Sequence, residues 1–324
     1  GRDAGRLLER LSANRVDGPA GRITYTQWLN QGGTLEADLT VTKLADERFL
    51  VVATDTMQRH VLAWMQRHIG DDEHAVVTDV TSGFAQLNVQ GPRSRELLQT
   101  LTSADLSNAA FPFRTAREID IGFARVLCIR ITYLGELGYE LYIPTEQAVP
   151  VYDRIVEAGA AFGLKHAGLK ALGSLRMEKG YRDYGHDIDN TDNAFETGLG
   201  FAVALGKPGG FIGCEAAAAQ KAAIDAAGAP SRRMLQIQFA DPQPMLFHAE
   251  VVWRDGRRVG YLRSASYGHT LGSAVGLAMI EAGEPVTEAW VAAGRWEVEV
   301  AGERHAARAS IEPLYDPGMQ RIRA

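Results

Sequence analysis

Apolar side chains recur along residues 1–230 with helical spacing in some segments and strand-like alternation in others. Strands are predicted in three segments between 21 and 53 and again at 84–90, where apolar and polar positions alternate. Helices are predicted near 6–11, 61–69, 97–101, 151–162, 168–180 and 214–227. This part of the chain is therefore expected to combine helices with strands that are joined by hairpins.

Beyond Pro230 the pattern changes to short strands separated by turn signals such as Asp255-Gly256 and Ala301-Gly302. The predicted strands are 234–239, 249–253, 259–266, 274–280, 295–300 and 306–311. Short strands at this spacing are typical of a barrel or jelly roll. We therefore expect a first domain over 1–230 and a C-terminal β domain over 231–324.

The composition is that of a folded globular protein. Hydrophobic residues make up 46% and charged residues 23% of the 324 residues, and no apolar run approaches the ~20 residues that cross a bilayer. The formal net charge of −6 argues against binding nucleic acid through a dominant positive surface. Cys128 and Cys214 are too few for a disulfide scaffold, so we expect a reducing compartment, the cytoplasm or, in a eukaryote, the mitochondrial matrix.

Residues 131–140 read as two strand-like arms around a turn that is marked by Gly135. Alternation along the strands and reversal of the chain predict that Tyr133 and Glu140 lie on one side of a hairpin. A tyrosine offers an apolar face, and an ionised glutamate offers two acceptor oxygens that suit the N–H groups of an aminopyrimidine-type heterocycle. Taken singly, such a hairpin is more often plain structure than a binding site.

A second segment, residues 25–44, reads as a strand, a Gly-Gly turn and another strand. Asp38 interrupts the second arm between apolar and β-branched neighbours. Because carboxylates are seldom buried without a partner, Asp38 is either satisfied by hydrogen bonds or placed to meet a ligand. The first arm carries Tyr25, for which a core or hairpin position is a close alternative.

The order of these motifs resembles the glycine-cleavage T-protein superfamily, whose members bind tetrahydrofolate and move one-carbon units. Further segments at 168–181, 198–203, 211–213 and 267–272 are similar to the folate-binding C-terminal half of dimethylglycine and sarcosine dehydrogenases or oxidases. The likeness spans nearly the whole chain. It implies an α+β fold of the T-protein type, with two interleaved antiparallel-sheet α+β subdomains and a C-terminal β-barrel or jelly-roll domain.

The resemblance also implies roles for single residues. Asp38 matches the catalytic acid that holds a folate amine and accepts its proton or stabilises a cationic intermediate. Tyr133 and Glu140 match the positions that grip the pterin ring. For His269 a structural place in the barrel is the stronger alternative. The expected folate-binding residues are Tyr25, Tyr133, Glu140, Tyr267 and His269.

The chain departs from T-proteins at Leu172, which stands where they carry an arginine for the folate tail. Arg176, one turn further on, is expected to be a salt-bridge residue on the surface of its helix. Lys207 and Arg263 are alternative bases for binding the tail. The ligand of the folate tail is therefore left open.

Metal and nucleotide sites are not expected. The acidic run at 183–192 lacks the glycine and glutamate that an EF-hand loop needs, and is expected to be a solvated or self-hydrogen-bonded loop. The eight histidines show no paired ligand spacing. Because no Gly-x-Gly-x-x-Gly unit is present, FAD is expected only in a partner or in a domain before Gly1.

Three functions follow from the resemblance. The first is tetrahydrofolate-dependent transfer of an aminomethyl or methylene group, coupled to flavin-dependent oxidation of an N-methylated glycine and giving 5,10-methylenetetrahydrofolate. The second is a free-standing folate-dependent demethylase of a small methylated compound. The third is a folate-binding regulatory or assembly protein without turnover. The partners are then a small-molecule one-carbon donor and a flavin oxidase domain or subunit, with no nucleic acid and no membrane.

Overall fold

The computed structural model describes residues 1–324 and places the first strands in a three-stranded antiparallel sheet of order β1-β2-β3. One face of this sheet carries Trp28, Ala37 and Leu39, which are buried against two helices. Helices α1 and α2 cover this face because their own leucine, valine and methionine side chains belong to the same core. The elements are α1 (Ala4–Leu11), β1 (Ile23–Leu29), β2 (Leu35–Ala45), β3 (Arg48–Ala53) and α2 (Gln58–Arg67).

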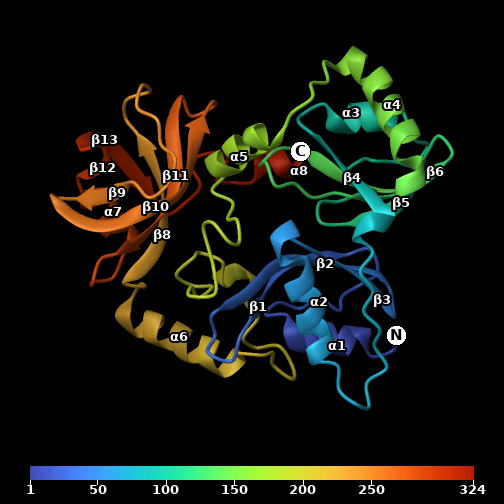
Figure 1. Cartoon of the computed structure of the whole chain (residues 1–324), viewed down its shortest axis with the longest axis horizontal. Helices are drawn as coiled ribbons and strands as arrows, with labels where there is room; N and C mark the ends of the chain where they lie inside the picture. Colours follow the sequence, from blue (N-terminus) through green and yellow to red (C-terminus); the bar gives the residue numbers. More distant parts are fainter.

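A second antiparallel sheet, of order β4-β7-β6-β5, lies beside the first (Figure 1). Helices α3 and α4 cover one of its faces. The other face packs on the first sheet, since Tyr142 and Ile129 share a buried cluster with Ile23. The elements are β4 (Phe84–Gln90), α3 (Ser94–Gln99), β5 (Ala116–Ile121), β6 (Ala124–Ile129), β7 (Gly138–Pro144) and α4 (Ala148–Gly159).

The chain then returns to the first sheet. Helix α5 (Leu169–Glu178) leads into a long irregular segment and helix α6 (Cys214–Ala227). Leu199 and Ala217 from this return share a buried core with Leu29 and Leu35 of the first hairpin. The α+β part is therefore interleaved, as expected. Short 3-10 turns occur at Asp55–Met57, Thr81–Gly83, Thr145–Gln147, Ala160–Phe162 and Gly200–Ala202.

The C-terminal strands close into a six-stranded barrel of order β10-β11-β8-β13-β12-β9, drawn in orange and red in Figure 1. This confirms the predicted barrel. Helix α5 lies between the barrel and the second sheet (Figure 1). The elements are β8 (Arg232–Phe239), β9 (Val251–Arg254), β10 (Arg257–Gly268), β11 (Ser273–Glu281), α7 (Glu288–Ala293), β12 (Trp296–Val300), β13 (Glu303–Ser310) and α8 (Gln320–Arg323). None of the helices combines the length and the apolar character needed to span a membrane.

The hairpin predicted at 131–140 differs from the structure. Strand β6 ends at Ile129 and β7 begins at Gly138, so Tyr133 lies in the connecting loop and not in a strand. Glu140 pairs with Ile129, so alternation along two paired arms does not bring Tyr133 and Glu140 together. The prediction was wrong because Gly135, at a φ of +80°, is one bend inside a longer connection and does not form a two-residue turn.

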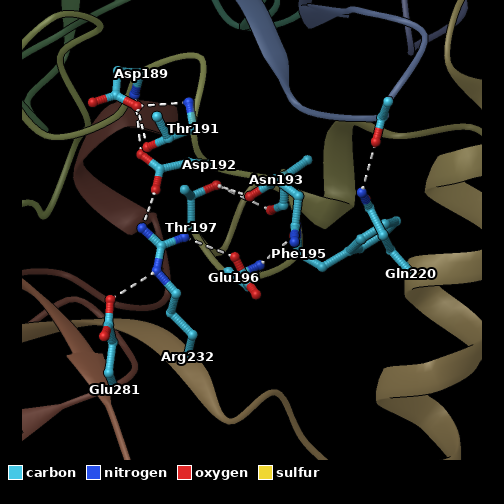
Figure 2. Close-up of polar contacts among 12 residues, drawn as sticks. Asp189, Thr191, Asp192, Asn193, Phe195, Glu196, Thr197, Gln220, Arg232 and Glu281 are labelled. Carbon is cyan, nitrogen blue, oxygen red and sulfur yellow. Dashed lines mark hydrogen bonds and ion pairs between the residues drawn. The ribbon is translucent and has the colours of Figure 1, made fainter.

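Two further expectations need correction. Arg176 is buried, and its guanidinium pairs with the fully buried carboxylate of Asp187, so it is not on a helix surface. The acidic run is self-hydrogen-bonded, as expected, since Asp189 accepts from Thr191 and Asp192 accepts from the backbone N–H of Asp189. It is not solvated throughout, because Asp192 is fully buried and pairs with Arg232 and Arg263 of the barrel. Figure 2 shows Asp192 and Glu281 on either side of Arg232. The acidic loop thus joins the barrel to the rest of the molecule.

Candidate functional site

The free face of the first hairpin carries a group of polar side chains. Gln27 of β1 stands opposite Asp38 of β2, and Tyr25 stands opposite Thr40 on the same face. Gln27 Nε2 donates a hydrogen bond of 2.9 Å to Asp38 Oδ1. The alternate positions face the helix-covered core, which fixes these polar side chains on the opposite side of the sheet.

Asp38 is an acid in a desolvated place. Burial raises its pKa from 3.8 to about 6, while the Gln27 amide, the Tyr25 phenol and the Arg182 guanidinium oppose this shift. The Tyr25 phenol also lies against the Asp38 carboxylate, and the residue keeps partial exposure. Gln27 is fully buried, and its Oε1 has no partner. The face therefore combines a carboxylate that titrates near neutrality with unused acceptors.

The segment after α5 covers this face. Tyr184 donates its hydroxyl to the carbonyl of Leu35, at the start of β2, at 3.3 Å. Tyr133 donates to the carbonyl of Arg182 at 2.6 Å, and its ring lies parallel to that of Tyr181 at a centroid distance of 5.9 Å. The charge on Asp38 contributes to raising the pKa of both Tyr25 and Tyr133, after the larger effect of burial. The structure thus brings Tyr25, Asp38 and Tyr133 into one neighbourhood.

Two residues of this neighbourhood were missed by sequence reasoning. Phe201 stacks on Tyr25 at 6.0 Å between ring centroids and is 74% exposed. The guanidinium of Arg182 affects the pKa of both Asp38 and Tyr25. Phe201 falls in a segment that carried the family resemblance, and Arg182 directly follows another, but only the folded structure shows that they lie by the first hairpin.

Glu140 lies on the facing sheet. Its side chain shares a face of β7 with Tyr142, which donates to Glu140 Oε2 at 2.8 Å and packs in the cluster with Ile23 of β1. Burial raises the pKa of Glu140, and Tyr142 and Gln86 oppose the shift. Glu140 makes no hydrogen bond to Asp38 or Tyr133. It faces the interface of the two sheets with one oxygen unused.

Tyr267 and His269 lie elsewhere, at the end of the barrel that meets α5. Tyr267 donates to the carbonyl of Gly272 at 2.9 Å, and its own carbonyl accepts from Ser174 of α5. The rings of Tyr267 and His269 are 5.2 Å apart, and His269 is exposed. Neither side chain makes a hydrogen bond to Asp38, Tyr133 or Glu140. Their place in a folate site stays a prediction.

The alternative bases for a folate tail are engaged elsewhere. Lys207 is buried, and its ammonium donates to the carbonyls of Ser12 and Asn14 while pairing with Glu9. Arg263 pairs with the buried Asp192. Neither cation is free to bind a ligand, because its partners are part of the fold. The structure contains no group of three or more His, Cys, Asp or Glu side chains that could hold a metal ion.

Family models match both parts of the chain. The GCVT N-terminal domain matches residues 1–207, and the glycine cleavage T-protein C-terminal barrel domain matches residues 232–316. The crystal structure of the glycine cleavage system aminomethyltransferase T from Bartonella henselae superimposes with a TM-score of 0.82, covering 98% of this chain and 82% of that one at 23% identity. That likeness confirms the T-protein fold.

Curated relatives show the same family. The chain is 38% identical to a 4-methylaminobutanoate oxidase (formaldehyde-forming) of Paenarthrobacter nicotinovorans and 33% identical to the mitochondrial sarcosine dehydrogenase of Mus musculus, with all of this chain aligned. It spans only 38% and 36% of their lengths. An aminomethyltransferase of Anoxybacillus flavithermus is 33% identical, over 97% of this chain and 83% of the relative. The two matched domains, the fold and this last relative together show that the chain belongs to the glycine cleavage T-protein family.

Proposed function

We propose that the chain catalyses tetrahydrofolate-dependent one-carbon transfer and that Asp38 is its catalytic acid. The observation that carries this proposal is a carboxylate with a pKa of about 6 on a sheet face that a second segment covers. A catalytic group works best when its pKa lies near the operating pH. The names of the relatives, an aminomethyltransferase and two enzymes of N-methylated amines, support the same chemistry.

The side chains of this region fit a folate. Glu140 keeps one oxygen free to accept from the N–H groups of a pterin, as does the buried carbonyl of Gln27. The stacked pair of Tyr25 and Phe201 offers a flat apolar wall. When bound, tetrahydrofolate supplies two N–H groups. Transfer of CH2 from an iminium CH2=NH+–R to these two nitrogens yields 5,10-methylenetetrahydrofolate and RNH3+. The transfer involves no redox change, because both folate protons end on the departing amine.

Asp38 then has a defined task. Its Oδ1 is held by Gln27, which leaves Oδ2 to accept a hydrogen bond from the attacking amine and to take its proton. In its ionised form it also stabilises the positive charge that persists on the one-carbon unit. The iminium itself requires an oxidation, which we assign to a flavin site in a partner or in another part of a longer polypeptide, acting on an N-methylated amino acid.

Replacement of Asp38 by alanine tests the proposal. Transfer above the uncatalysed rate should fall by about 10²–10⁴-fold, the usual contribution of a positioned acid or base. The rate is followed as methylenetetrahydrofolate formed from N-methylglycine in the presence of a sarcosine-oxidising flavoprotein. Affinity for 5-formyltetrahydrofolate, measured by titration calorimetry, should stay near that of the wild type.

Asp46→Ala is the matched control, since this carboxylate lies beyond the end of β2 and is 97% exposed. It should leave both readouts unchanged. Equal transfer by the wild type and Asp38→Ala would contradict the catalytic role. Absence of folate binding by the wild type would contradict the proposal as a whole. Folate binding without any transfer would favour the regulatory alternative.

A further inference from the structure

Arg182 is a cation without an anionic partner. Its Nε donates to the carbonyl of Thr197 at 2.9 Å, and its Nη1 donates to the carbonyl of Gly180. No carboxylate oxygen lies within the ion-pair distance of 4.0 Å of its guanidinium. Arg176, Arg232 and Arg263 differ from it, because each of them pairs with an aspartate. Arg182 is therefore held by neutral groups only.

The side chain of Arg182 is also fixed in direction. A Cβ placed on Gly198 would lie 2.7 Å from Arg182 Nη2, so the glycine leaves the room that this nitrogen occupies. Gly198 has a φ of +76°, which favours glycine at this position in its own right. The Nη2 hydrogens have no acceptor in the chain, and the residue is partly exposed.

Arg182 lies close enough to the face that carries Asp38 for its charge to act on Asp38 and Tyr25. Gly198 lies three residues before Phe201, whose ring stacks on Tyr25. The carbonyl of Arg182 accepts from Tyr133. The guanidinium favours the ionised form of Asp38, and burial lowers the pKa of Arg182 itself because its charge lacks a close counter-ion. An anionic ligand at this place would complete the charge balance that the fold leaves open.

We infer that Arg182 binds the carboxylate of the one-carbon donor, so that this chain takes its methylene group from amino-acid-derived iminium ions and not from those of simple alkylamines. The inference rests on the proposed function. A charged Nη2 with free N–H groups can donate a charge-assisted hydrogen bond to a carboxylate. The place of Arg182 beside the proposed catalytic acid favours the donor over the folate tail, whose carboxylates lie at the far end of the folate from its reacting amines.

Stable amines with and without a carboxylate test the inference on the full chain. N-methylglycine and dimethylamine both carry a methylated amine, but only the first has a carboxylate. We expect wild type to bind N-methylglycine at least about ten-fold more tightly, the effect of a charge-assisted pair. Arg182→Met should abolish the preference, and Arg182→Lys should restore part of it. Arg125→Met, which removes an exposed arginine of β6, is the control of equal charge and should keep the preference.

Each titration is performed with and without 5-formyltetrahydrofolate, and a melting curve checks that each variant is folded. An equal affinity of wild type for both amines, or an unchanged preference in Arg182→Met, would overturn the inference. A third result would also overturn it: Arg182→Met loses affinity for 5-formyltetrahydrofolate but not for 5-formyltetrahydropteroate, which lacks the glutamate tail. The folate tail would then be the ligand of Arg182. A wild type that binds no folate would contradict the proposed function, while the amine preference would still decide the role of Arg182.

Discussion

At the scale of single residues, two acids occupy strand positions where apolar side chains would give a more stable fold. Asp38 interrupts a strand whose alternate positions are buried, and Glu140 does the same on the facing sheet. Burial disfavours the charged form of both carboxyls and raises their pKa values. Such positions reduce stability, and they persist in proteins mainly where function depends on them.

The cost of Asp38 should be measurable as a function of pH. Its folded pKa of about 6 lies above its usual value of 3.8, so ionisation destabilises the fold as pH rises between these values. Asp38→Asn should therefore increase the free energy of unfolding by about 2–3 kcal/mol at pH 7 and by less than about 1 kcal/mol at pH 4. Urea unfolding at both pH values checks this. A gain that does not depend on pH would contradict the raised pKa.

Glu140 should contribute to affinity and not to turnover. Glu140→Ala removes the acceptor that we assign to the pterin, so binding of 5-formyltetrahydrofolate should weaken by about 1–3 kcal/mol. Titration calorimetry measures the change. Glu118→Ala is the control, because this glutamate of β5 is exposed and pairs only with Arg125 at the surface. Equal affinity of the wild type and Glu140→Ala would remove Glu140 from the site.

At the scale of elements, the sequence predicted most of the fold. Strand 84–90 and helix 214–227 have the bounds that were predicted, and all six barrel strands were found within a few residues. These elements are amphipathic, alanine-rich or bounded by turn residues, so local pattern is enough to define them. The connection around Tyr133 was predicted wrongly, because its glycines read as a tight turn although tertiary contacts shape a longer loop.

The candidate site was predictable only in part. Asp38 stood out because a carboxylate in an apolar strand is unusual. Arg182 and Phe201 gave no such signal, since a cation or an aromatic residue in a loop is ordinary until the structure shows what lies beside it. Their roles depend on contacts between residues far apart in the chain, which no local pattern encodes.

One carboxylate, that of Glu178, contributes to the contact of α5 with the barrel. Glu178 is buried, and its Oε1 accepts from the backbone N–H groups of Thr270 and Leu271 at 2.6 and 2.9 Å. Glu178→Ala should lower the free energy of unfolding by about 1–3 kcal/mol, because both donors lose a charged acceptor. Urea unfolding tests this against Glu303→Ala, an exposed glutamate at the start of β13. Equal stability of the two variants would contradict the assigned contact.

At the scale of the whole molecule, the acidic loop holds the barrel in place. Both oxygens of Asp192 pair with barrel arginines, Arg232 and Arg263, and Arg232 also pairs with Glu196 of the same loop (Figure 2). Gln220 of α6 donates to the carbonyl of Gly32 in the first hairpin. The division into domains at 230 stays a prediction, and the pairs of Asp192 and Glu196 with barrel arginines are contacts that would join the two parts.

Removal of the charge on Asp192 should loosen this junction. Asp192→Asn leaves two arginines without their buried counter-ion, so the free energy of unfolding should fall by about 3–5 kcal/mol. Cleavage by trypsin after Arg232 or Arg233, at the start of β8, should become faster. Asp225→Asn, which removes an exposed helix pair with Lys221, should change stability by less than about 0.5 kcal/mol. An Asp192→Asn variant as stable as this control would show that the junction depends on other contacts.

The return of the chain to its first sheet has a consequence for biosynthesis. Leu29 and Leu35 leave the ribosome long before Leu199 and Ala217, the residues that bury them. When synthesis has reached the end of α5, the apolar side chains of Leu29 and Leu35 are still exposed, because the segment that covers them has not yet been made. The interval between these two stretches is when the growing polypeptide depends most on chaperones.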